Sequence, residues 1–553
     1  MKKILALVVA ALLVLSMVAA FADETTYTIT ISKDSTDKAA HTYGAFQLFK
    51  GKLETVNGNK VLSDIQWGDS IDTTKLAALR IALNGIDGVT VANDADAVAV
   101  AKAISDANIT NDNAKAQAVA DAFNAALTSS AKATGTIAAD ATQGTITGLT
   151  AGYYLVKDTA AVSGEGAKTR FILQVVDNVS VTEKANVPSV EKKVQDEAGN
   201  WQDAADYDIG DSVPYKITGT LPGKFAEYDT YKTYTITDTL SNGLTPPAVA
   251  DVKITLDTIE GTDLSSLFDI TVTGQVIKAQ LKTGVDLKTA TVGDPQVGFS
   301  ATSKIILSYS AVLNENAVIG SGGNDNTVHI DFSNNPNYDG DGDHGTTPDD
   351  KVVVFTYEIK ALKVEPTSDA AITQAEYDAL TAEQKADYVK VGDKWQKTQA
   401  LSGAGFTLYK KVNNEWVAVG NEISGVTTFE FKGTDAGEYK LVETTVPAGY
   451  NKAEDVIITV TATYDTEAAE PKLKSLTVTP ATAGFTVTTT TIQNDETHIT
   501  TDGIISGKIL NQKGSTLPST GGIGTTIFYI GGSILVLAAV ILLVTKRRMG
   551  TND

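Results

Sequence analysis

The chain of 553 residues carries 45 basic and 67 acidic side chains, which leaves a formal net charge of −22. So acidic a composition argues against nucleic acid as a partner and favours a solvated extracellular protein. With no cysteine, four histidines, no phosphate-binding loop and no Gly-rich dinucleotide turn, the chain lacks the patterns of the common enzymes and cofactor sites. We therefore predict no enzyme activity on other molecules, no cofactor and no metal centre.

The N-terminus has the pattern of a secretory signal. Two lysines precede an apolar run over residues 4–20, and the small residues around Ala20 and Ala22 come directly before acidic, Thr-rich sequence. This pattern predicts export and cleavage after Ala22, so that residues 1–22 are a signal peptide. The alternative is an uncleaved membrane-anchoring helix, which the small residues and the abrupt change in composition disfavour.

Short runs of alternating apolar and polar residues fill most of the remaining chain. Examples are residues 27–31, 357–361 and 458–462, and Gly, Asn and Asp separate such runs. This alternation is typical of half-buried strands and predicts a mainly β fold of tandem Ig-like β-sandwich domains. Two segments depart from it, because the Ala-rich residues 91–127 and the amphipathic residues 372–391 predict helical insertions.

Two stretches mark domain boundaries. Residues 181–194 place a proline between two strand-like runs, and residues 334–350 are rich in Gly, Asp and Pro. Together with about 490 residues between the two ends, they predict three domains, at 23–185, 186–348 and 349–515.

The second boundary also contains a cluster of carboxylates. Asp339, Asp341 and Asp343 lie at alternate positions and Asp350 follows, a grouping that suits calcium. The glycine is misplaced for an EF-hand loop, and the final acidic residue is Asp rather than Glu. We therefore interpret the segment as a solvated acidic linker without a metal.

The predicted last domain places a lysine and an asparagine on inward strand faces. Glu443 falls on a middle strand of the same domain. Period two puts two sets of residues on one face of the first and of the last strand: Tyr357, Ile359, Ala361 and Lys363, and Ile505, Gly507, Ile509 and Asn511. Lys363 and Asn511 thus point into an apolar core. The alternative is that Lys363, Glu443 and Asn511 are surface residues of ordinary strands.

Burial gives these three groups a reaction that they do not have in water. In an apolar site the pKa of a lysine falls and that of a nearby carboxylic acid rises, so the pair can exchange a proton. The neutral Lys363 amine is then a nucleophile, the protonated Glu443 polarises the Asn511 carboxamide, and the fold holds them at high effective concentration. The predicted product is a Lys–Asn isopeptide bond with release of ammonia. It would tie the first strand to the last in a chain without disulfides.

The C-terminus combines LPSTG at residues 517–521, an apolar stretch at residues 523–544 and a basic tail at residues 545–553. The apolar stretch is long enough to cross a bilayer, and the basic residues favour the cytoplasmic side. The order of the three features resembles the sorting signal of sortase substrates.

That resemblance implies a specific transfer reaction. Leu517 and Pro518 belong to the motif that a sortase recognises, and the enzyme cuts the bond between Thr520 and Gly521. The carbonyl group of Thr520 is then passed to an amine. The implied partners are a sortase and the peptidoglycan of a cell wall.

Motifs in the last domain resemble those of pilus backbone subunits. LVETTVPAGY, at residues 441–450, resembles the pilin E-box, whose pattern is Tyr-x-Leu-x-Glu-Thr followed by Pro-x-Gly-Tyr. LSGAGFTLYKK resembles the strand that precedes it in Cna-B-type domains. The resemblance covers residues 349–515 apart from the insertion at 372–391. It implies a major pilin of a Gram-positive bacterium, with Glu443 as the acid that promotes the isopeptide bond.

The middle domain resembles the second domain of major pilins more loosely. That resemblance implies Lys192 as a nucleophile, Asp238 as an acid and Asn334 as the acceptor of a second isopeptide bond. Asn326 has the same strand parity as Asn334 and stays open as a rival acceptor. Lys193 likewise stays open as a rival lysine.

The first domain contains HTYGAFQLFKG and LSDIQWGDSID, which resemble the first domain of the same pilins. Lys33, Asp158 and Asn178 fall where a third isopeptide bond would need them. The alternative, that Lys33 is a solvated lysine of an edge strand, carries equal weight.

Polymerisation requires an exposed amine that accepts the Thr520 acyl group of the next subunit. In the pilin family this lysine lies between the first and second domains, in a Tyr-Pro-Lys setting. The matching stretch here is VSVTEKANVP, which makes Lys184 the candidate, with Thr182 and Glu183 in place of the aromatic residue and the proline. The alternative is an interdomain surface lysine without a role.

These features predict a structural subunit of a covalently polymerised surface pilus, secreted and attached to the cell wall after a transient stay in the membrane. Its predicted partners are a sortase, identical subunits, other pilins and peptidoglycan, and a ligand on a host surface is left open. Two alternatives remain: a monomeric wall-anchored adhesin, and an accessory or basal pilin that needs no acceptor lysine.

Overall fold

The computed structural model describes most of the chain between the predicted signal peptide and the apolar C-terminal segment. The described residues are 25–33, 37–56, 59–107, 113–159, 166, 168, 170–182, 187–257, 261–336, 344–466, 470–480, 485–487, 491–494, 497–514 and 523–549. The predicted signal peptide, Lys184, the acidic Asp339, Asp341 and Asp343, and the LPSTG motif lie outside them.

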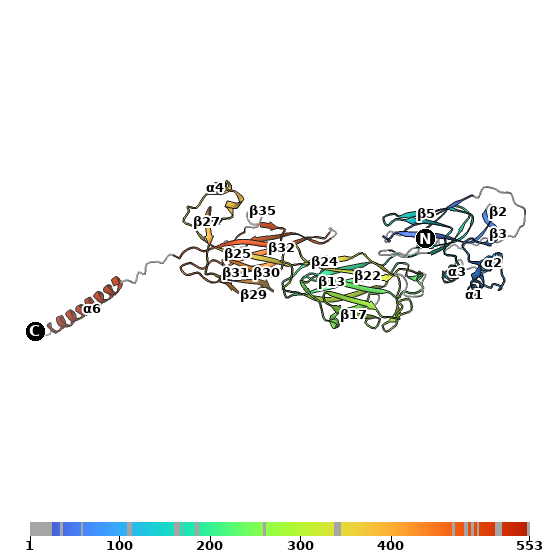
Figure 1. Cartoon of the computed structure of the whole chain (residues 1–553). Coiled ribbons are helices and arrows are strands. Elements are labelled where there is room, and N and C mark those ends of the chain that lie inside the picture. The colour runs from blue at the N-terminus through green and yellow to red at the C-terminus, as the bar shows by residue number, and fades with distance from the viewer. Residues whose placement is uncertain are drawn as a thin grey trace. The chain divides into compact units, whose positions relative to one another are not determined.

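The chain divides into two compact units, which are treated separately. One comprises Met1–Tyr357 with Gly433–Asp435 and Ala462–Lys474, and the other comprises the remaining residues. Strands dominate both units (Figure 1), so the predicted mainly β fold is confirmed.

The N-terminal part of the first unit contains two sheets. Strand β1 (Tyr27–Ser32) lies at the centre of the smaller sheet and β2 (His41–Val56) pairs with three strands of the larger one. The other strands are β5 (Gln143–Leu149) and β8 (Val179–Thr182) in the smaller sheet, and β3 (Asn59–Trp67), β6 (Gly152–Asp158), β7 (Arg170–Val175) and β4 (Ala133–Ile137) in the larger one.

Helices pack on this part through a separate apolar cluster. Helix α2 (Ala97–Asp106) begins after Asp96, whose side chain accepts a hydrogen bond from the Ala99 N–H group, and it buries Val100 and Ile104. The helices predicted over residues 91–127 are thus present as α2 and α3 (Asn113–Ala125). The chain also forms η1 (Thr73–Lys75) and α1 (Leu76–Asn84), which were not predicted although LAALRIALN is rich in helix formers.

The middle part consists of two seven-stranded sheets around one core. Its inward residues alternate along each strand, as period two requires. The first sheet contains β10 (Trp201–Gln202), β9 (Val190–Gln195), β12 (Ser212–Thr220), β21 (Lys304–Leu313), β15 (Lys253–Leu256), β16 (Thr262–Asp263) and β14 (Leu244–Thr245). The second sheet, seen in green and yellow in Figure 1, contains β11 (Ala204–Asp206), β24 (Asp350–Phe355), β22 (Asn324–Ser333), β13 (Tyr234–Leu240), β18 (Val276–Leu281), β17 (Phe268–Thr273) and β23 (His344–Thr346). Short elements complete it: η3 (Phe225–Glu227), η4 (Val249–Asp251), β19 (Thr291–Val292) and β20 (Val297–Gly298).

The boundary predicted between residues 348 and 349 is wrong. Strand β24 follows the Gly/Asp/Pro-rich stretch but pairs with β22 and β11 of the middle part, and the compact unit extends to Tyr357. A loop that returns to its own sheet has the same turn-forming composition as a linker between domains, and composition alone does not separate the two.

The last domain is built on two sheets, and its first and last strands are neighbours. Strand β25 (Tyr357–Pro366) runs parallel to β37 (Ile504–Leu510). The same sheet contains β26 (Tyr388–Val391), β27 (Lys394–Ala400), β34 (Phe485–Val487) and β30 (Thr428–Thr434). The other contains β29 (Glu415–Ser424), β28 (Gly405–Val412), β31 (Gly437–Thr445), β32 (Val456–Asp465), β33 (Lys472–Pro480), β36 (Thr497–Thr500) and β35 (Thr491–Asn494).

The insertion predicted as helical over residues 372–391 is only partly helical. Two short helices, α4 (Gln374–Asp378) and α5 (Ala382–Lys385), each begin with a capping box. The final residues form β26, which pairs with β27, so a helix was wrongly predicted there. The β-branched and aromatic residues of Tyr388–Val391 favour the strand.

The C-terminal segment forms one long helix, α6 (Ile523–Met549). Its stretch Tyr529–Lys546 is long and apolar enough to cross a membrane. The helix extends beyond the predicted span of 523–544, so that the basic residues predicted as a separate tail continue the helix as far as Met549.

Candidate functional site

The last domain brings Lys363, Glu443 and Asn511 together in its core. In the parallel pairing of β25 with β37, Lys363 lies opposite Ile509, and Asn511 follows just beyond the strand with its N–H group bonded to the Val364 carbonyl. Lys363 is fully buried, and Glu443 and Asn511 are each only 1 % exposed. The inward faces predicted from period two are therefore the buried faces in the structure.

One carboxylate oxygen of Glu443 lies between the two groups that would react. Glu443 Oε1 is 3.1 Å from Lys363 Nζ and accepts a hydrogen bond from Asn511 Nδ2 at 2.9 Å. Lys363 Nζ donates to Asn511 Oδ1 at 2.6 Å. The amine, the acid and the carboxamide thus form a closed triangle of contacts.

The sequence after Glu443 fixes its other oxygen. Glu443 Oε2 accepts a hydrogen bond from the Ala453 N–H group at 2.6 Å, after the Pro-Ala-Gly-Tyr turn. Tyr450 of that turn donates its own hydrogen bond to Glu365, on the first strand. The E-box pattern therefore places the acid and also the turn that orients it.

Burial prepares Lys363 to act as a nucleophile. Desolvation lowers the pKa of this lysine to about 8, although the charge of Glu443 acts in the opposite direction. A neutral amine is consequently accessible near physiological pH. Because Glu443 Oε1 contacts both nitrogens, it can accept the proton of the amine and deliver it to the leaving nitrogen of Asn511.

The middle domain holds a second buried lysine–acid pair. Lys192 on β9 and Asp238 on β13 are both fully buried, and Lys192 Nζ donates to Asp238 Oδ1 at 2.5 Å. Desolvation lowers the pKa of Lys192, partly offset by the charge of Asp238. The two residues come from opposite sheets, so their contact crosses the core.

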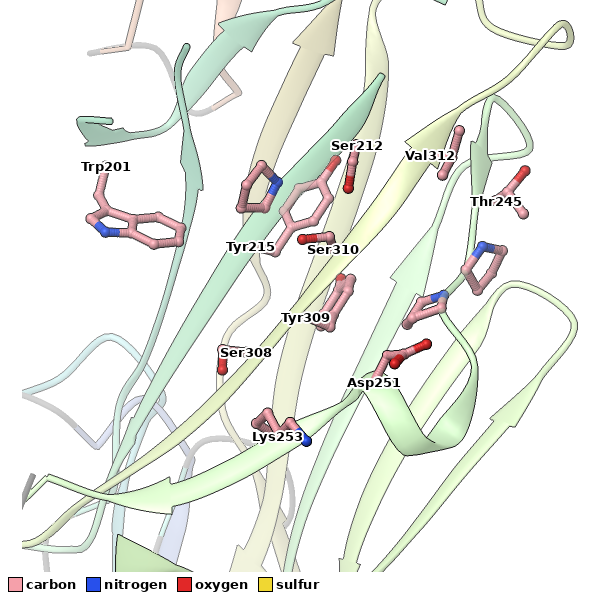
Figure 2. Close-up of a pocket in the computed structure, with 13 residues that line it drawn as sticks. Trp201, Ser212, Tyr215, Thr245, Asp251, Lys253, Ser308, Tyr309, Ser310 and Val312 are labelled. Atoms are coloured by element: carbon pink, nitrogen blue, oxygen red, sulfur yellow. The ribbon is translucent and has the colours of Figure 1, made fainter. Parts of the chain in front are cut away.

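Tyr309 connects this pair to a buried asparagine that is Asn326 rather than Asn334. The hydroxyl group of Tyr309 on β21 donates to Asp238 Oδ2 and accepts from Asn326 Nδ2 at 2.7 Å. It also lies 3.3 Å from Lys192 Nζ. Figure 2 shows Tyr309 beside Tyr215, which lies opposite it on β12 with their rings stacked at 5.3 Å.

The acceptor implied by family resemblance, Asn334, is placed elsewhere. Asn334 is buried, but its Nδ2 donates to the Gly166 carbonyl at 3.1 Å. Asn334 and Asn326 are expected on the same face of the strand. They are eight residues apart, however, which corresponds to roughly 27 Å along an extended strand. Asn326 and Lys192 both contact the Tyr309 hydroxyl group, which makes Asn326 the better-placed acceptor.

The rival lysine is also placed elsewhere. Lys193 follows Lys192 on β9 and therefore points to the opposite face of the strand, where its Nζ donates to Asp203 at 2.6 Å. The structure thus leaves Lys192 as the lysine of the middle site.

The three residues predicted for a bond in the first domain are not brought together. Lys33 lies just beyond β1, and its Nζ donates to three backbone carbonyl groups. Asn178 lies in the turn before β8, is exposed, and accepts from the Thr28 N–H group. The alternative of a solvated Lys33 is also wrong, because this side chain is buried.

Asp158 instead belongs to a buried cluster that the sequence analysis missed. His41 Nδ1 is 3.0 Å from Asp158, and its Nε2 is 3.1 Å from Asp37. Burial alone would lower the pKa of His41, but the hydrogen bonds and charges of the two aspartates raise it to about 10. The first domain thus holds a charged histidine between two carboxylates, and Asp37 and His41 four residues apart were the available signal.

Asp350, the fourth acidic residue of the predicted linker, has a structural contact. Its Oδ2 accepts a hydrogen bond from the Lys192 N–H group at 2.5 Å, so it tethers β24 to β9. Within the described ranges, no group of three His, Asp or Glu residues is placed to hold a metal ion.

Three family matches cover separate parts of the chain. Residues 209–336 match the Gram-positive pilin backbone subunit 2 Cna-B-like domain, and residues 387–474 match a prealbumin-like fold domain. Residues 509–549 match the LPXTG cell wall anchor motif. This is the domain set of a Gram-positive backbone pilin. The backbone-pilin match contains Asp238, Tyr309 and Asn326, and the prealbumin-like match contains Glu443.

One known protein with similarity to this pilin is a streptococcal surface protein. The Trypsin-resistant surface T6 protein of Streptococcus pyogenes serotype M6 is 26% identical over 420 residues, which are 66% of this chain and 70% of that protein.

Solved structures of pilins also align with most of the chain. The T6 backbone pilin of Streptococcus pyogenes has 16% identity and a TM-score of 0.47, covering 89% of this chain and 100% of that one. The major pilin SpaA of Corynebacterium diphtheriae has 13% identity and a TM-score of 0.39, covering 88% and 100%. Both TM-scores lie below 0.5, so these superpositions add nothing about the site.

Proposed function

We propose that this backbone pilin forms a covalent polymer in which Thr520 of one copy is joined to Lys184 of the next. We further propose that Lys–Asn isopeptide bonds close its last and middle domains. The observation that carries the second part is the fully buried triangle of Lys363, Glu443 and Asn511, with contacts of 2.6 to 3.1 Å. A buried lysine and carboxylate without a further purpose are costly to keep, because both groups lose their hydration.

The proposed reaction in the last domain needs no external reagent. The proton of the Lys363 ammonium passes to Glu443, and the neutral Nζ forms a bond to the Asn511 carboxamide carbon. The bond from that carbon to Nδ2 breaks, and Nδ2 leaves as ammonia after it takes that proton from Glu443, while the second proton of Nζ passes to Glu443, which ends protonated. Each atom is accounted for, since an amine and a primary amide give a secondary amide and ammonia.

The position of this bond suits a subunit under tension. The chain enters the last domain at β25 and leaves it after β37 towards the anchor, and these strands are parallel neighbours. A bond from Lys363 to Asn511 would carry force directly between them. The two residues are 148 positions apart in the sequence, and the chain between them would then carry none of the pulling force.

The matched anchor motif implies a sortase and a peptidoglycan linkage, and the pilin backbone match implies polymerisation with other pilin subunits. Our specific proposal adds the acceptor. Lys184 lies between β8 and β9 in the sequence, and both the lysine and the LPSTG motif lie outside the described residues. The acceptor assignment therefore depends on sequence position alone.

Changing Lys184 to Ala in the native host tests the acceptor directly. We expect the detergent-resistant ladder of polymers in cell-wall extracts to disappear, while the monomer is still exported and attached to the wall. Cleavage at Thr520 does not need Lys184, and only chain growth does. Lys193→Ala is the matched control, since Lys193 is paired with Asp203 and should leave the ladder unchanged.

Two results would contradict this proposal. A ladder of normal length in Lys184→Ala would assign the acceptor role to another lysine. The absence of any ladder in the unmutated strain, with the protein abundant on its surface, would favour a monomeric adhesin.

A further inference from the structure

The acid of the middle site does not contact the amide in the way that Glu443 does. The side chain of Asp238 is one methylene shorter than that of Glu443. Its two oxygens accept hydrogen bonds from Lys192 Nζ and from the Tyr309 hydroxyl group. The amide nitrogen of Asn326 donates to that same hydroxyl at 2.7 Å. The hydroxyl group of Tyr309 is therefore the link between the acid and the nitrogen that would leave as ammonia.

We propose that Tyr309 is a catalytic proton relay in the middle domain, and that Asn326 is the acceptor of the isopeptide bond formed by Lys192. This inference rests on the proposed isopeptide function and assigns two residues that the family resemblance did not supply. The hydroxyl contacts all three reacting groups, with Lys192 Nζ 3.3 Å away.

The proposed relay moves two protons of the Lys192 ammonium group. The Lys192 ammonium gives a proton to Asp238, and the neutral Nζ forms a bond to the carboxamide carbon of Asn326. As the carbon–Nδ2 bond breaks, the Tyr309 hydroxyl gives its proton to Nδ2, which leaves as ammonia. The protonated Asp238 returns a proton to the Tyr309 oxygen and takes up the second proton of Nζ as that nitrogen becomes the secondary amide, so that Asp238 ends protonated and the leaving group is neutral ammonia.

The surroundings of Tyr309 suit a concerted transfer. Its side chain belongs to a core of apolar residues, and Lys192 Nζ lies 5.1 and 5.5 Å from the ring centres of Tyr215 and Tyr309. Burial raises the pKa of Tyr309 well above its ordinary value, so a free phenolate is not a stable intermediate. A proton must therefore arrive from Asp238 as the other leaves for Asn326.

The test follows crosslink formation in the full chain, made by cell-free translation and sampled over time by peptide mapping. Tyr309→Phe removes only the hydroxyl group. We expect the Lys192–Asn326 crosslink to form roughly 100-fold more slowly, since general acid–base groups contribute at least about this factor. The Lys363–Asn511 crosslink of the same molecules should form at the unmutated rate.

Two further tyrosines supply matched controls. Tyr231→Phe removes a buried hydroxyl group of the same core that has no hydrogen-bond partner among the described residues, and should leave both rates unchanged. Tyr215→Phe removes the neighbouring hydroxyl. If Tyr215→Phe stopped the reaction while Tyr309→Phe did not, the relay assignment would be overturned.

A substitution that keeps the fold separates catalysis from packing. 3-Fluorotyrosine at position 309 keeps the ring and the hydroxyl group but makes the hydroxyl more acidic, so a relay predicts a changed rate and a purely structural role an unchanged one. An unchanged rate in both position-309 variants would overturn this inference but would leave the proposed isopeptide function standing. A crosslink from Lys192 to Asn334 would overturn it too, whereas the absence of every crosslink in the unmutated chain would overturn the proposed function itself.

Discussion

The last and middle domains assemble the same three functional groups in two different ways. In the last domain a single glutamate oxygen contacts both Lys363 and Asn511. In the middle domain the shorter Asp238 reaches the lysine, and the Tyr309 hydroxyl completes the path to Asn326. In both proposed reactions a proton path runs from the nucleophile to the leaving nitrogen, and the two domains supply this path with different side chains.

The first domain differs from both, because hydrogen bonds and ion pairs hold its buried histidine and lysine. His41 lies between Asp37 and Asp158, and Asp158 is one of the three residues predicted for a third isopeptide bond. A histidine held between two carboxylates satisfies buried groups without a covalent bond, and Lys33 is satisfied by backbone carbonyl groups.

The largest expected effect comes from removing the direct acid of the last domain. Glu443→Ala should abolish the Lys363–Asn511 crosslink and leave the Lys192–Asn326 crosslink intact. Loss of a bond that closes so long a loop should lower the stability of the last domain by roughly 5 kcal/mol. In calorimetry its melting temperature should then fall by roughly 10 to 20 °C.

Asn511→Ala is the matched control for this change, because it removes the acceptor and keeps the acid. Both variants should lose the same crosslinked peptide. A Lys363–Asn511 crosslink at full yield in Glu443→Ala would mean that another group carries the proton, and the comparison between the two domains would fail.

A smaller effect concerns how the stability of the last domain depends on pH when the Lys363–Asn511 bond cannot form. In Asn511→Ala, Lys363 remains a free amine whose pKa in the folded state is about 8, against an ordinary value of 10.5. Below pH 8 the lysine is protonated in both the folded and the unfolded state. The full free-energy cost of burying its charge then lowers the stability of the folded state. Between pH 8 and 10.5 only the unfolded state still binds the proton, so stability should rise with pH.

Thermal unfolding of the Asn511→Ala chain between pH 7 and 9.5 measures this effect. The gain should be about 2 kcal/mol, which corresponds to one and a half pKa units of lysine titration. The unmutated chain, in which we propose that Lys363 is part of an amide, should lack this gain. Equal pH dependence in the two chains would show that Lys363 is not crosslinked.

Much of the last site could be predicted because its residues lie on regular strands. Period two placed Lys363 and Asn511 inward, and the E-box pattern located Glu443. In the middle domain the same rule could not choose between Asn326 and Asn334, since residues eight apart share parity and differ only in their position along the strand.

Other features depend on contacts between elements that are distant in sequence. Tyr309 alternates with apolar residues like any core tyrosine, and its role appears only when β21 packs opposite β13 and β22. The end of the middle domain was misplaced for a different reason, because the chain returns after the Gly/Asp/Pro-rich stretch and β24 pairs with β22, the strand that precedes this stretch.

The account is tested most directly by the mass and the peptide map of the unmutated protein. Its central claim predicts a mass lower than that of the sequence by two molecules of ammonia, with crosslinked peptides joining Lys363 to Asn511 and Lys192 to Asn326. A mass equal to that of the uncrosslinked chain, with all four side chains recovered in separate peptides, would contradict it.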